Sequence, residues 1–286
     1  MKFVDTPAII RAMNIKLGHS PDADDAFMFY GLAEGLVDSG DYRIEHVLKD
    51  IQTLNDQATR GQLEITAISA HAYAYVRDKY ILTRCGGSFG QGYGPKIVAR
   101  EPMAEKDLGE VSIAVPGTTT SAYLALQLYR PNLRTTVLPF DQIVPAVIAG
   151  VVDCGLIIHE GQVTFERMGL HEIVDLGRWW QANTSLPLPL GLNAIRRDLD
   201  EKVRRELSEI LLRTIQYSLA HRPEALKHAM KYARNVPEDL AGQFVGMYVN
   251  DMTLDMGRQG KKAVEEFLGQ AHQAGLVPNA LPIELV

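Results

Sequence analysis

The amino-acid sequence, 286 residues long, predicts an α/β fold made of two lobes around a cleft. Three features predict it. Apolar stretches typical of strands alternate with helical patterns along most of the chain. This alternation starts again near residue 110, which indicates a second unit with its own βαβαβ order. From residue 198 onward the pattern is mostly helical, and we expect both ends of the chain to form one larger lobe.

The first unit is expected to begin with a strand and to alternate regularly. Strands are predicted over residues 14–20, 42–48, 63–69 and 94–100, and helices over residues 20–35, 51–61 and 70–80. Ser20 is the candidate N-cap of the first helix, and Pro21 suits its first position. Acidic residues in the first turn favour the same start, because they complement the helix dipole.

The second unit shows the same alternation. Strands are predicted over residues 111–115, 135–140 and 154–160, residues 118–121 open one helix, and residues 142–150 form another. Residues 175–199 are interpreted as a crossover with a return strand over 190–197, followed by a long helix over 198–221. We therefore expect residues 1–109 and 187–286 to form the larger lobe and residues 110–186 the smaller one, joined by two hinge strands.

Composition and charge exclude several classes of protein. The formal net charge of −6 and the lack of any run rich in Lys or Arg argue against nucleic-acid binding. No stretch approaches the roughly 18 uninterrupted apolar residues of a membrane helix, and Asp5, Pro7 and Arg11 interrupt the N-terminus, so no signal peptide is expected. Cys85 and Cys154 form no CxxC motif and are interpreted as reduced, packed thiols. We expect a cytoplasmic protein with neither nucleic-acid nor membrane partners.

Polar residues after the predicted strand 111–115 form the first candidate site. Thr119, Thr120 and Ser121 add hydroxyl donors to the free N–H groups of a helix N-terminus, where an anion such as a carboxylate is favoured. The same hydroxyls could equally serve only as caps of that helix. Neither a P-loop nor a dinucleotide fingerprint is present in this segment.

Two further motifs carry weaker signals. The glycine-rich segment 88–97 suggests phosphate binding, but Pro95 follows its third glycine, and a turn before a strand is the favoured interpretation. His19 and three acids within residues 19–27 suggest a metal site, yet their spacing fits neither an EF-hand nor HExxH. We favour a role for this strand-to-helix turn in lining the cleft. No metal and no cofactor are expected.

His159 is the candidate for proton transfer. It lies near the carboxyl end of the predicted strand 154–160, at the edge where ligands of open α/β sheets bind. An imidazole with its ordinary pKa of about 6.5 accepts a proton at neutral pH, although a lone histidine is usually structural. Residues 66–69, at the end of another predicted strand, either face the same cleft or cap the next helix.

Seven segments, taken in their order and spacing, resemble one family. They are LGHSPDADDAFMFYGL, VLKDIQTLN, AHAYAYVRDKY, AVPGTTTSAYLAL, GLIIHE, DLGRWW and LPLPLG, and the likeness runs from about residue 14 to the C-terminus. The chain resembles the 1,4-dihydroxy-6-naphthoate synthases of the futalosine route to menaquinone. One position departs from that family, which often shows S-P-x-x-N-D-x-F, because Asp24 stands here in the place of the Asn. The first dozen residues look like an added extension.

The resemblance implies a periplasmic-binding-protein-like fold and a reaction that needs no metal or redox cofactor. It implies that cyclic dehypoxanthine futalosine is cleaved to 1,4-dihydroxy-6-naphthoate and dihydroxyacetone, with His159 as the general base. It also implies that a small carboxylated substrate contacts two stretches of the chain, which are Thr66, Ala67, Ile68, Ser69 and Thr120, Ser121, Ala122. The expected assembly is a monomer or a homodimer.

Two alternatives stay open. A chorismate dehydratase of the same pathway would share the two-lobed layout, but the histidine of GLIIHE favours the synthase. A non-catalytic cytoplasmic solute-binding protein would also share the lobes and the cleft, and it would bind its ligand without consuming it.

Overall fold

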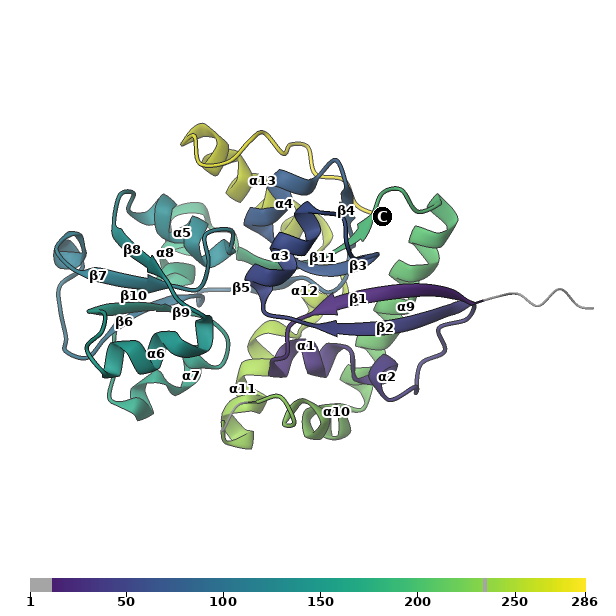
Figure 1. Ribbon diagram of the computed structural model, residues 1–286, viewed down its shortest axis with the longest axis horizontal. Helices are drawn as coiled ribbons and strands as arrows, with labels where there is room; N and C mark the ends of the chain where they lie inside the picture. Colours follow the sequence, from purple (N-terminus) through teal and green to yellow (C-terminus); the bar gives the residue numbers. More distant parts are fainter. Residues whose placement is uncertain (1–11, 234–235) are drawn as a thin grey trace, which may run out of the picture.

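The chain folds into two lobes, each built on its own β-sheet (Figure 1). The structure is a computed structural model that describes residues 12–233 and 236–286. The expected N-terminal extension falls on residues 1–11, which lie outside the described residues. The prediction of an α/β fold is confirmed, because strands of both sheets alternate with helices along the chain.

The larger lobe has a six-stranded sheet. Its strands follow the order β2, β1, β3, β11 and β4, and β5 pairs with β11. Their bounds are Met13–His19 (β1), Tyr42–Leu48 (β2), Ile65–Ser69 (β3), Tyr80–Leu82 (β4), Ser88–Gly90 (β5) and Leu188–Arg196 (β11). Strand β1 pairs in parallel with β2 and β3, so all three end at the same edge of the sheet.

Helices cover both faces of this sheet (Figure 1). One side carries α3 (Ile51–Thr59), α4 (Ala70–Val76) and α13 (Gly257–Gln273), and the other carries α1 (Ala23–Met28), α9 (Glu201–Ala220), α10 (Arg222–Ala229) and α11 (Glu238–Tyr248). Helices α2 (Tyr30–Ala33) and α12 (Asp251–Leu254) are short. Phe27, Leu211 and Phe244 belong to one buried apolar cluster that joins α1, α9 and α11. Within the described part of the chain, no helix has the length and apolar character needed to cross a membrane.

The smaller lobe has a five-stranded sheet in the order β10, β6, β9, β7 and β8. The bounds are Lys96–Ala99 (β6), Ser112–Val115 (β7), Arg134–Val137 (β8), Cys154–Ile157 (β9) and His171–Asp175 (β10). Its helices are α5 (Ser121–Tyr129), α6 (Phe140–Ile148), α7 (Gly161–Thr164) and α8 (Leu176–Thr184), with two 3-10 helices at Glu105–Gly109 and Phe165–Met168. Strand β7 pairs in parallel with β8 and β9, so the ends of β7 and β9 also share an edge.

The chain passes from the first sheet to the second earlier than expected. Strand β6 lies in the smaller sheet, although it precedes the expected boundary at residue 110. The crossings lie in residues 91–95 and 185–187. The local sequence does not indicate that β6 belongs to the smaller sheet. Its membership depends on antiparallel pairing with β9 and β10, which are distant in sequence. We propose that the smaller lobe spans residues 94–186.

The first helix begins at Ala23, and its N-cap is Asp22, whose carboxylate accepts a hydrogen bond from the N–H of Asp25 at 3.3 Å. The expected cap at Ser20 is wrong. The backbone N–H of Ser20 instead donates to the Asp25 carboxylate at 2.6 Å. Two residues therefore separate the end of β1 from the cap, and the acids of this turn are held by hydrogen bonds.

Candidate active site

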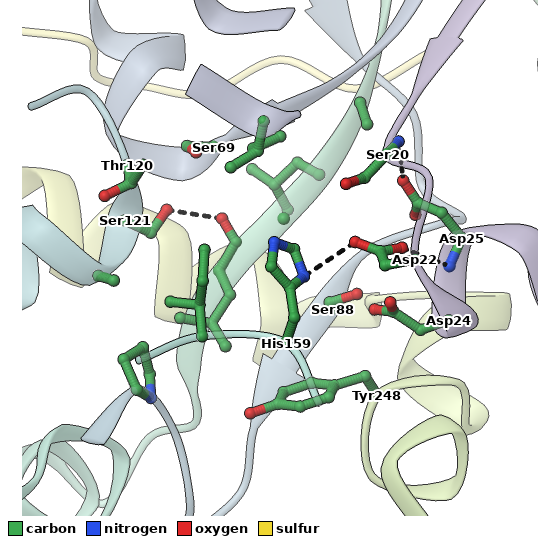
Figure 2. A pocket seen from close by; sticks show the side chains of 18 of the residues that line it. Ser20, Asp22, Asp24, Asp25, Ser69, Ser88, Thr120, Ser121, His159 and Tyr248 are labelled. Carbon is green, nitrogen blue, oxygen red and sulfur yellow. Dashed lines mark hydrogen bonds and ion pairs between the residues drawn. The ribbon is translucent and has the colours of Figure 1, made fainter. Parts of the chain in front are cut away.

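A pocket with about 710 Å³ of empty space, part of it open to solvent, lies between the two lobes. Its polar lining comes mostly from segments that follow the ends of β1, β3, β7 and β9. The polar side chains that line it are Ser20, Asp22, Asp24, Asp25, Ser69, Ser88, Thr120, Ser121, His159, Gln162, Asn193 and Tyr248 (Figure 2). The pocket therefore sits where strand ends of both sheets meet, which is the usual ligand position in α/β folds.

His159 lies between the acidic turn after β1 and the Thr120–Ser121 segment (Figure 2). Its backbone φ is 56°, in the left-handed region, which places the residue in a turn directly after β9. The ring stands 4.6 Å from the ring of Phe140, centroid to centroid, in an edge-on arrangement. Its Nε2 atom is buried and has no hydrogen-bond partner among the described residues, although the residue lines the pocket. Backbone strain of this kind is common at functional sites.

The other ring nitrogen of His159 is held by Asp22. Nδ1 lies 2.8 Å from Oδ2 of Asp22, whose side chain is only 4% exposed. Burial lowers the pKa of His159, but the Asp22 charge and hydrogen bond outweigh it and raise the pKa above the usual 6.5. Burial raises the pKa of Asp22, yet His159 holds it well below its usual range. Asp22 is therefore ionised, and it fixes the proton of a neutral His159 on Nδ1.

The neighbouring acids of the same turn behave differently. Burial first, and then the charges of Asp22 and Asp25, raise the pKa of Asp24 well above its usual range. Burial and Asp22 raise the pKa of Asp25 to about 8. Oδ1 of Asp24 is buried and has no partner among the described residues. At neutral pH the turn therefore presents one carboxylate, Asp22, beside two protonated carboxyl groups.

Further hydrogen bonds join the lobes beside His159. The backbone N–H of Ala23 donates to Oε1 of Glu160 at 3.0 Å, and the hydroxyl of Tyr248 donates to Oε1 of Gln162 at 2.7 Å. Burial, followed by the charge of Asp22, raises the pKa of Glu160. Glu160 and Gln162 follow β9, whereas Ala23 and Tyr248 belong to the larger lobe. The segment directly after His159 is thus held against the larger lobe by two hydrogen bonds.

The start of α5 lines the opposite part of the pocket. Oγ1 of Thr120 accepts a hydrogen bond from the N–H of Tyr123 at 3.2 Å, so the interpretation as a helix cap is correct. Thr120 and Ser121 also line the pocket, and the two interpretations are compatible. The Ser121 hydroxyl donates to the carbonyl of Leu190 at 2.6 Å, which ties α5 to β11 of the larger lobe.

Asn55 of α3 positions Ser69. Its side chain accepts from the N–H of Ser69 at 2.9 Å and donates to the Ser69 hydroxyl oxygen at 3.0 Å. It also donates to the carbonyl of Thr119 at 3.2 Å. Asn55 is fully buried, so this amide links the end of β3 to the start of α5 across the cleft.

The structure brings most of the expected site residues together. Those that line the pocket are Ala67, Ser69, Thr120, Ser121, Ala122 and His159. Thr66 and Ile68 are not among the lining residues: both are fully buried, and the Thr66 hydroxyl donates to the carbonyl of Ala67. The reason is the alternation of side chains along β3, which sends Ala67 and Ser69 to one face and their neighbours to the other. Their roles in substrate contact stay predictions.

Some lining residues had no signal in the sequence. Tyr248 and Gln162 occur in helices and are joined by a hydrogen bond across more than eighty positions of the chain. Asn193 lies within β11, and its side-chain nitrogen is buried without a partner among the described residues. For Asn193, the one available sequence signal was a polar residue within an otherwise apolar strand, because buried polar groups normally have a hydrogen-bond partner.

Among the described residues, the ligand atoms of Asp22, Asp24 and His159 lie close enough together to hold a metal ion. These atoms lie within 4.8 Å of one another. Two of the three side chains are already joined by the Asp22–His159 contact, and burial keeps the third protonated. The cluster is accounted for by proton sharing, and it suits hydrogen bonding to a bound ligand.

Residues 15–273 match a protein family described as "Menaquinone biosynthesis". Two curated relatives carry the name 1,4-dihydroxy-6-naphtoate synthase. The protein of Thermus thermophilus is 42% identical and covers 94% of this chain and 98% of its own length. The protein of Streptomyces coelicolor is 34% identical, over 93% of this chain and 96% of its own length.

Solved structures extend the comparison to the fold. A protein of Archaeoglobus fulgidus superposes with a TM-score of 0.89 at 44% identity, over 92% of this chain and 98% of its own. The alkanesulfonate-binding protein of Xanthomonas axonopodis superposes with a TM-score of 0.74 at only 12% identity, over 96% and 98%. The second similarity concerns the fold alone, and it confirms the expected periplasmic-binding-protein-like architecture.

Proposed function

Since the chain belongs to the menaquinone biosynthesis family, we propose that it is a 1,4-dihydroxy-6-naphthoate synthase, the activity for which its two relatives are named. The substrate in this proposal is cyclic dehypoxanthine futalosine, and the products are 1,4-dihydroxy-6-naphthoate and dihydroxyacetone. The reaction class is a carbon–carbon bond cleavage started by removal of a proton.

One observation carries the proposal. His159 offers a buried, unpartnered Nε2 in the pocket while Asp22 holds Nδ1 at 2.8 Å. In neutral His159 the proton sits on Nδ1, so Nε2 carries the free electron pair that a general base needs. This arrangement is the same division of roles by which an acid orients a catalytic histidine in other enzymes.

The chemistry follows from the substrate. It is a spiro compound in which one six-membered ring is ready to become aromatic. Nε2 of His159 removes the proton of a hydroxyl group on the sugar-derived part, and that oxygen forms a carbonyl as the carbon–carbon bond to the ring breaks. The electron pair of the broken bond enters the ring as an enolate, which takes up a proton and becomes a phenol. Aromatisation makes the step favourable. The imidazolium that forms is stabilised by the Asp22 carboxylate, and general-base help of this kind is worth about 10²–10⁴-fold in rate.

The far end of the pocket suits a carboxylate. Thr120 and Ser121 start α5, where free N–H groups and the helix dipole favour negative charge. Ser69, held by Asn55, adds a hydroxyl on the neighbouring strand end. We assign this end to the substrate carboxylate and the acidic turn to its hydroxyl groups, for which protonated Asp25 is a suitable hydrogen-bond donor and the unpartnered Oδ1 of Asp24 a suitable acceptor.

The test is direct. Purified protein is incubated separately with cyclic dehypoxanthine futalosine and with chorismate, and products are identified by mass spectrometry. Formation of 1,4-dihydroxy-6-naphthoate from the first substrate supports the proposal. Conversion of chorismate instead would make the protein a dehydratase, and recovery of unchanged ligand from both incubations would favour a binding protein.

A further inference from the structure

Asn193 is a polar residue in the middle of β11, and it lines the cleft pocket. The residue is only 2% exposed. Its side-chain nitrogen is buried and has no hydrogen-bond partner among the described residues. An amide nitrogen carries two N–H donors, and buried donors are almost always paired, so this group is available to a bound ligand.

The surrounding backbone holds Asn193 in place. Its carbonyl accepts hydrogen bonds from the backbone N–H of Thr83 at 2.9 Å and from the Thr83 hydroxyl at 3.1 Å. Gly86 makes room for the side-chain amide, because a Cβ at that position would lie 1.9 Å from Nδ2 of Asn193. Gly86 also has a φ of 80°, in the left-handed region, and it lines the pocket. The amide is therefore packed in a fixed position before any ligand enters.

Unpartnered polar atoms gather at this pocket. Six buried side-chain nitrogen or oxygen atoms have no hydrogen-bond partner among the described residues, and four of them belong to residues that line the pocket. These four are Oγ of Ser20, Oδ1 of Asp24, Nε2 of His159 and Nδ2 of Asn193. A ligand that pairs with all four contacts the proposed base and the amide at once.

The register of the larger sheet shows which part of a ligand reaches Asn193. On β11, Gly191 lies opposite Ser69 and Asn193 lies opposite Ala67 of β3. Asn193 is thus about 7 Å further along the strand than the end to which we assign the substrate carboxylate. That end and the acidic turn lie on opposite sides of His159 (Figure 2). The amide therefore faces the ring of the substrate rather than its carboxylate.

The proposed reaction creates negative charge on that ring. When the carbon–carbon bond breaks, its electron pair enters the ring as an enolate, and charge builds up on the ring carbonyl oxygen until this oxygen takes up a proton. His159 removes one proton and the enolate takes up one, so the step needs neither an oxidant nor a reductant. Fixed donors directed at such an oxygen accelerate reactions strongly, because they need no reorganisation as the charge develops.

We propose that the side-chain N–H of Asn193 donates to this oxygen and stabilises the enolate. The inference rests on the proposed function and adds a second catalytic residue to it. An amide keeps its protons at every working pH. It also has no competing acceptor among the described residues, in contrast to Ser121, whose hydroxyl donates to the carbonyl of Leu190.

Asn193→Leu tests the role, because leucine has as many side-chain heavy atoms as asparagine and no donor. With cyclic dehypoxanthine futalosine, kcat should fall about 10²–10³-fold while KM changes less than about threefold. The acidic limb of kcat/KM should stay in place, because His159 and Asp22 are untouched. The midpoint of urea denaturation should not fall, because the change removes an unpaired buried donor.

Gln57→Leu is the matched control. Oε1 of Gln57 is also buried without a partner among the described residues, but Gln57 does not line the pocket. This variant makes the same amide-to-leucine change elsewhere in the larger lobe, and its kcat and KM should equal those of the wild type.

A kcat within a few-fold of the wild type in Asn193→Leu would overturn the inference and leave the proposed function intact. A loss of kcat together with a displaced acidic limb would overturn it too, since the amide would then act through His159. If the leucine variant fails to fold, Asn193→Ala replaces it, with the same expectations for kcat and for the pH profile. Failure of the wild type to convert the substrate would overturn the proposed function, and the inference with it.

Discussion

Nδ1 of His159 and Oδ2 of Asp22 meet at 2.8 Å although the two residues belong to different lobes. Asp22 caps α1 of the larger lobe, and His159 follows β9 of the smaller one. A base whose tautomer and charge depend on a partner across the cleft is complete only when the lobes are together. We therefore expect the proposed proton transfer to take place only when the two lobes are together.

Asp22→Asn should move the pH dependence of the reaction. A general base must be neutral, so kcat/KM rises as pH passes through the pKa of His159, which Asp22 raises above 6.5. The variant keeps the side-chain oxygen and loses the charge, while burial remains and lowers that pKa. We expect the acidic limb of the profile to move to lower pH and kcat to fall about 10²-fold. An unshifted acidic limb in kcat/KM profiles would contradict the dyad.

His159→Ala removes the proposed base and leaves the rest of the pocket. Ligand binding should persist, because the polar groups of α5 and the acidic turn are unchanged, whereas turnover should slow at least about a hundredfold. Stopped-flow or discontinuous product assays measure the rate, and calorimetry measures binding. His221→Ala, on the exposed end of α9, is the control. Turnover close to the wild-type rate in His159→Ala would refute the assigned role.

Asp24→Asn should be tolerated, in contrast to the same change two residues earlier. Burial and the nearby carboxylates keep Asp24 protonated, so it interacts with Asp22 as a neutral donor. The amide of an asparagine has the same shape and also donates. We expect kcat/KM to stay within a few-fold of the wild type, measured beside Asp22→Asn in one assay. A loss equal to that of Asp22→Asn would mean that Asp24 works as a charged group.

The fold class and part of the candidate site could be predicted from the sequence. The remainder depends on contacts between residues that are distant in sequence. The alternation of strands and helices predicted the two sheets, and the strand ends predicted that Ser69, Thr120 and His159 would share a pocket. The pairing of β6 with the smaller sheet depends on contacts between residues distant in sequence, which no local pattern contains. The Asp22–His159 contact could not be predicted either, because it also joins residues that are distant in sequence. An acid at the start of a helix is readily explained as an N-cap, and Asp22 is indeed the N-cap of α1.

Asp25→Asn should stabilise the protein, increasingly so as pH rises. The pKa of Asp25 is raised to about 8 in the folded chain, whereas in the unfolded chain it returns to about 3.8. The wild type therefore loses stability as pH rises from about 4 to 8, because the unfolded chain releases a proton that the folded chain retains. The asparagine has no proton to lose and keeps an oxygen for the Ser20 N–H. Each pH unit in that window is worth about 1.4 kcal/mol at most.

The measurement is chemical denaturation of both proteins at pH 5 and pH 7.5. The advantage of Asp25→Asn should be larger at the higher pH by up to about 3 kcal/mol. Equal differences at both pH values would show that Asp25 is ionised in the folded protein, and the description of the acidic turn would then be wrong.

Lys96→Met should destabilise the smaller lobe strongly. Lys96 Nζ lies 2.8 Å from Oδ2 of Asp175 and also binds Glu172, and the side chain of Asp175 is only 1% exposed. The methionine fills the same space and removes the cation, which leaves a buried carboxylate beside Glu172 with Arg178 as a distant cation at 3.9 Å. Breaking one partner of a buried ion pair typically costs about 3–5 kcal/mol.

Arg84→Met is the matched control, because it breaks the Arg84–Asp255 ion pair, whose side chains are 54% and 51% exposed. Exposed ion pairs of this kind contribute about 1 kcal/mol or less to the free energy of unfolding. Asp175 also caps α8 by accepting from the N–H groups of Gly177 and Arg178, at 2.9 and 3.0 Å, so its charge keeps part of its stabilisation after Lys96 is removed. The loss in Lys96→Met should therefore lie toward the lower end of the range and still exceed that of the control clearly in urea denaturation. Similar losses in the two variants would mean that water reaches Asp175 and that the carboxylate is not confined between β6 and β10.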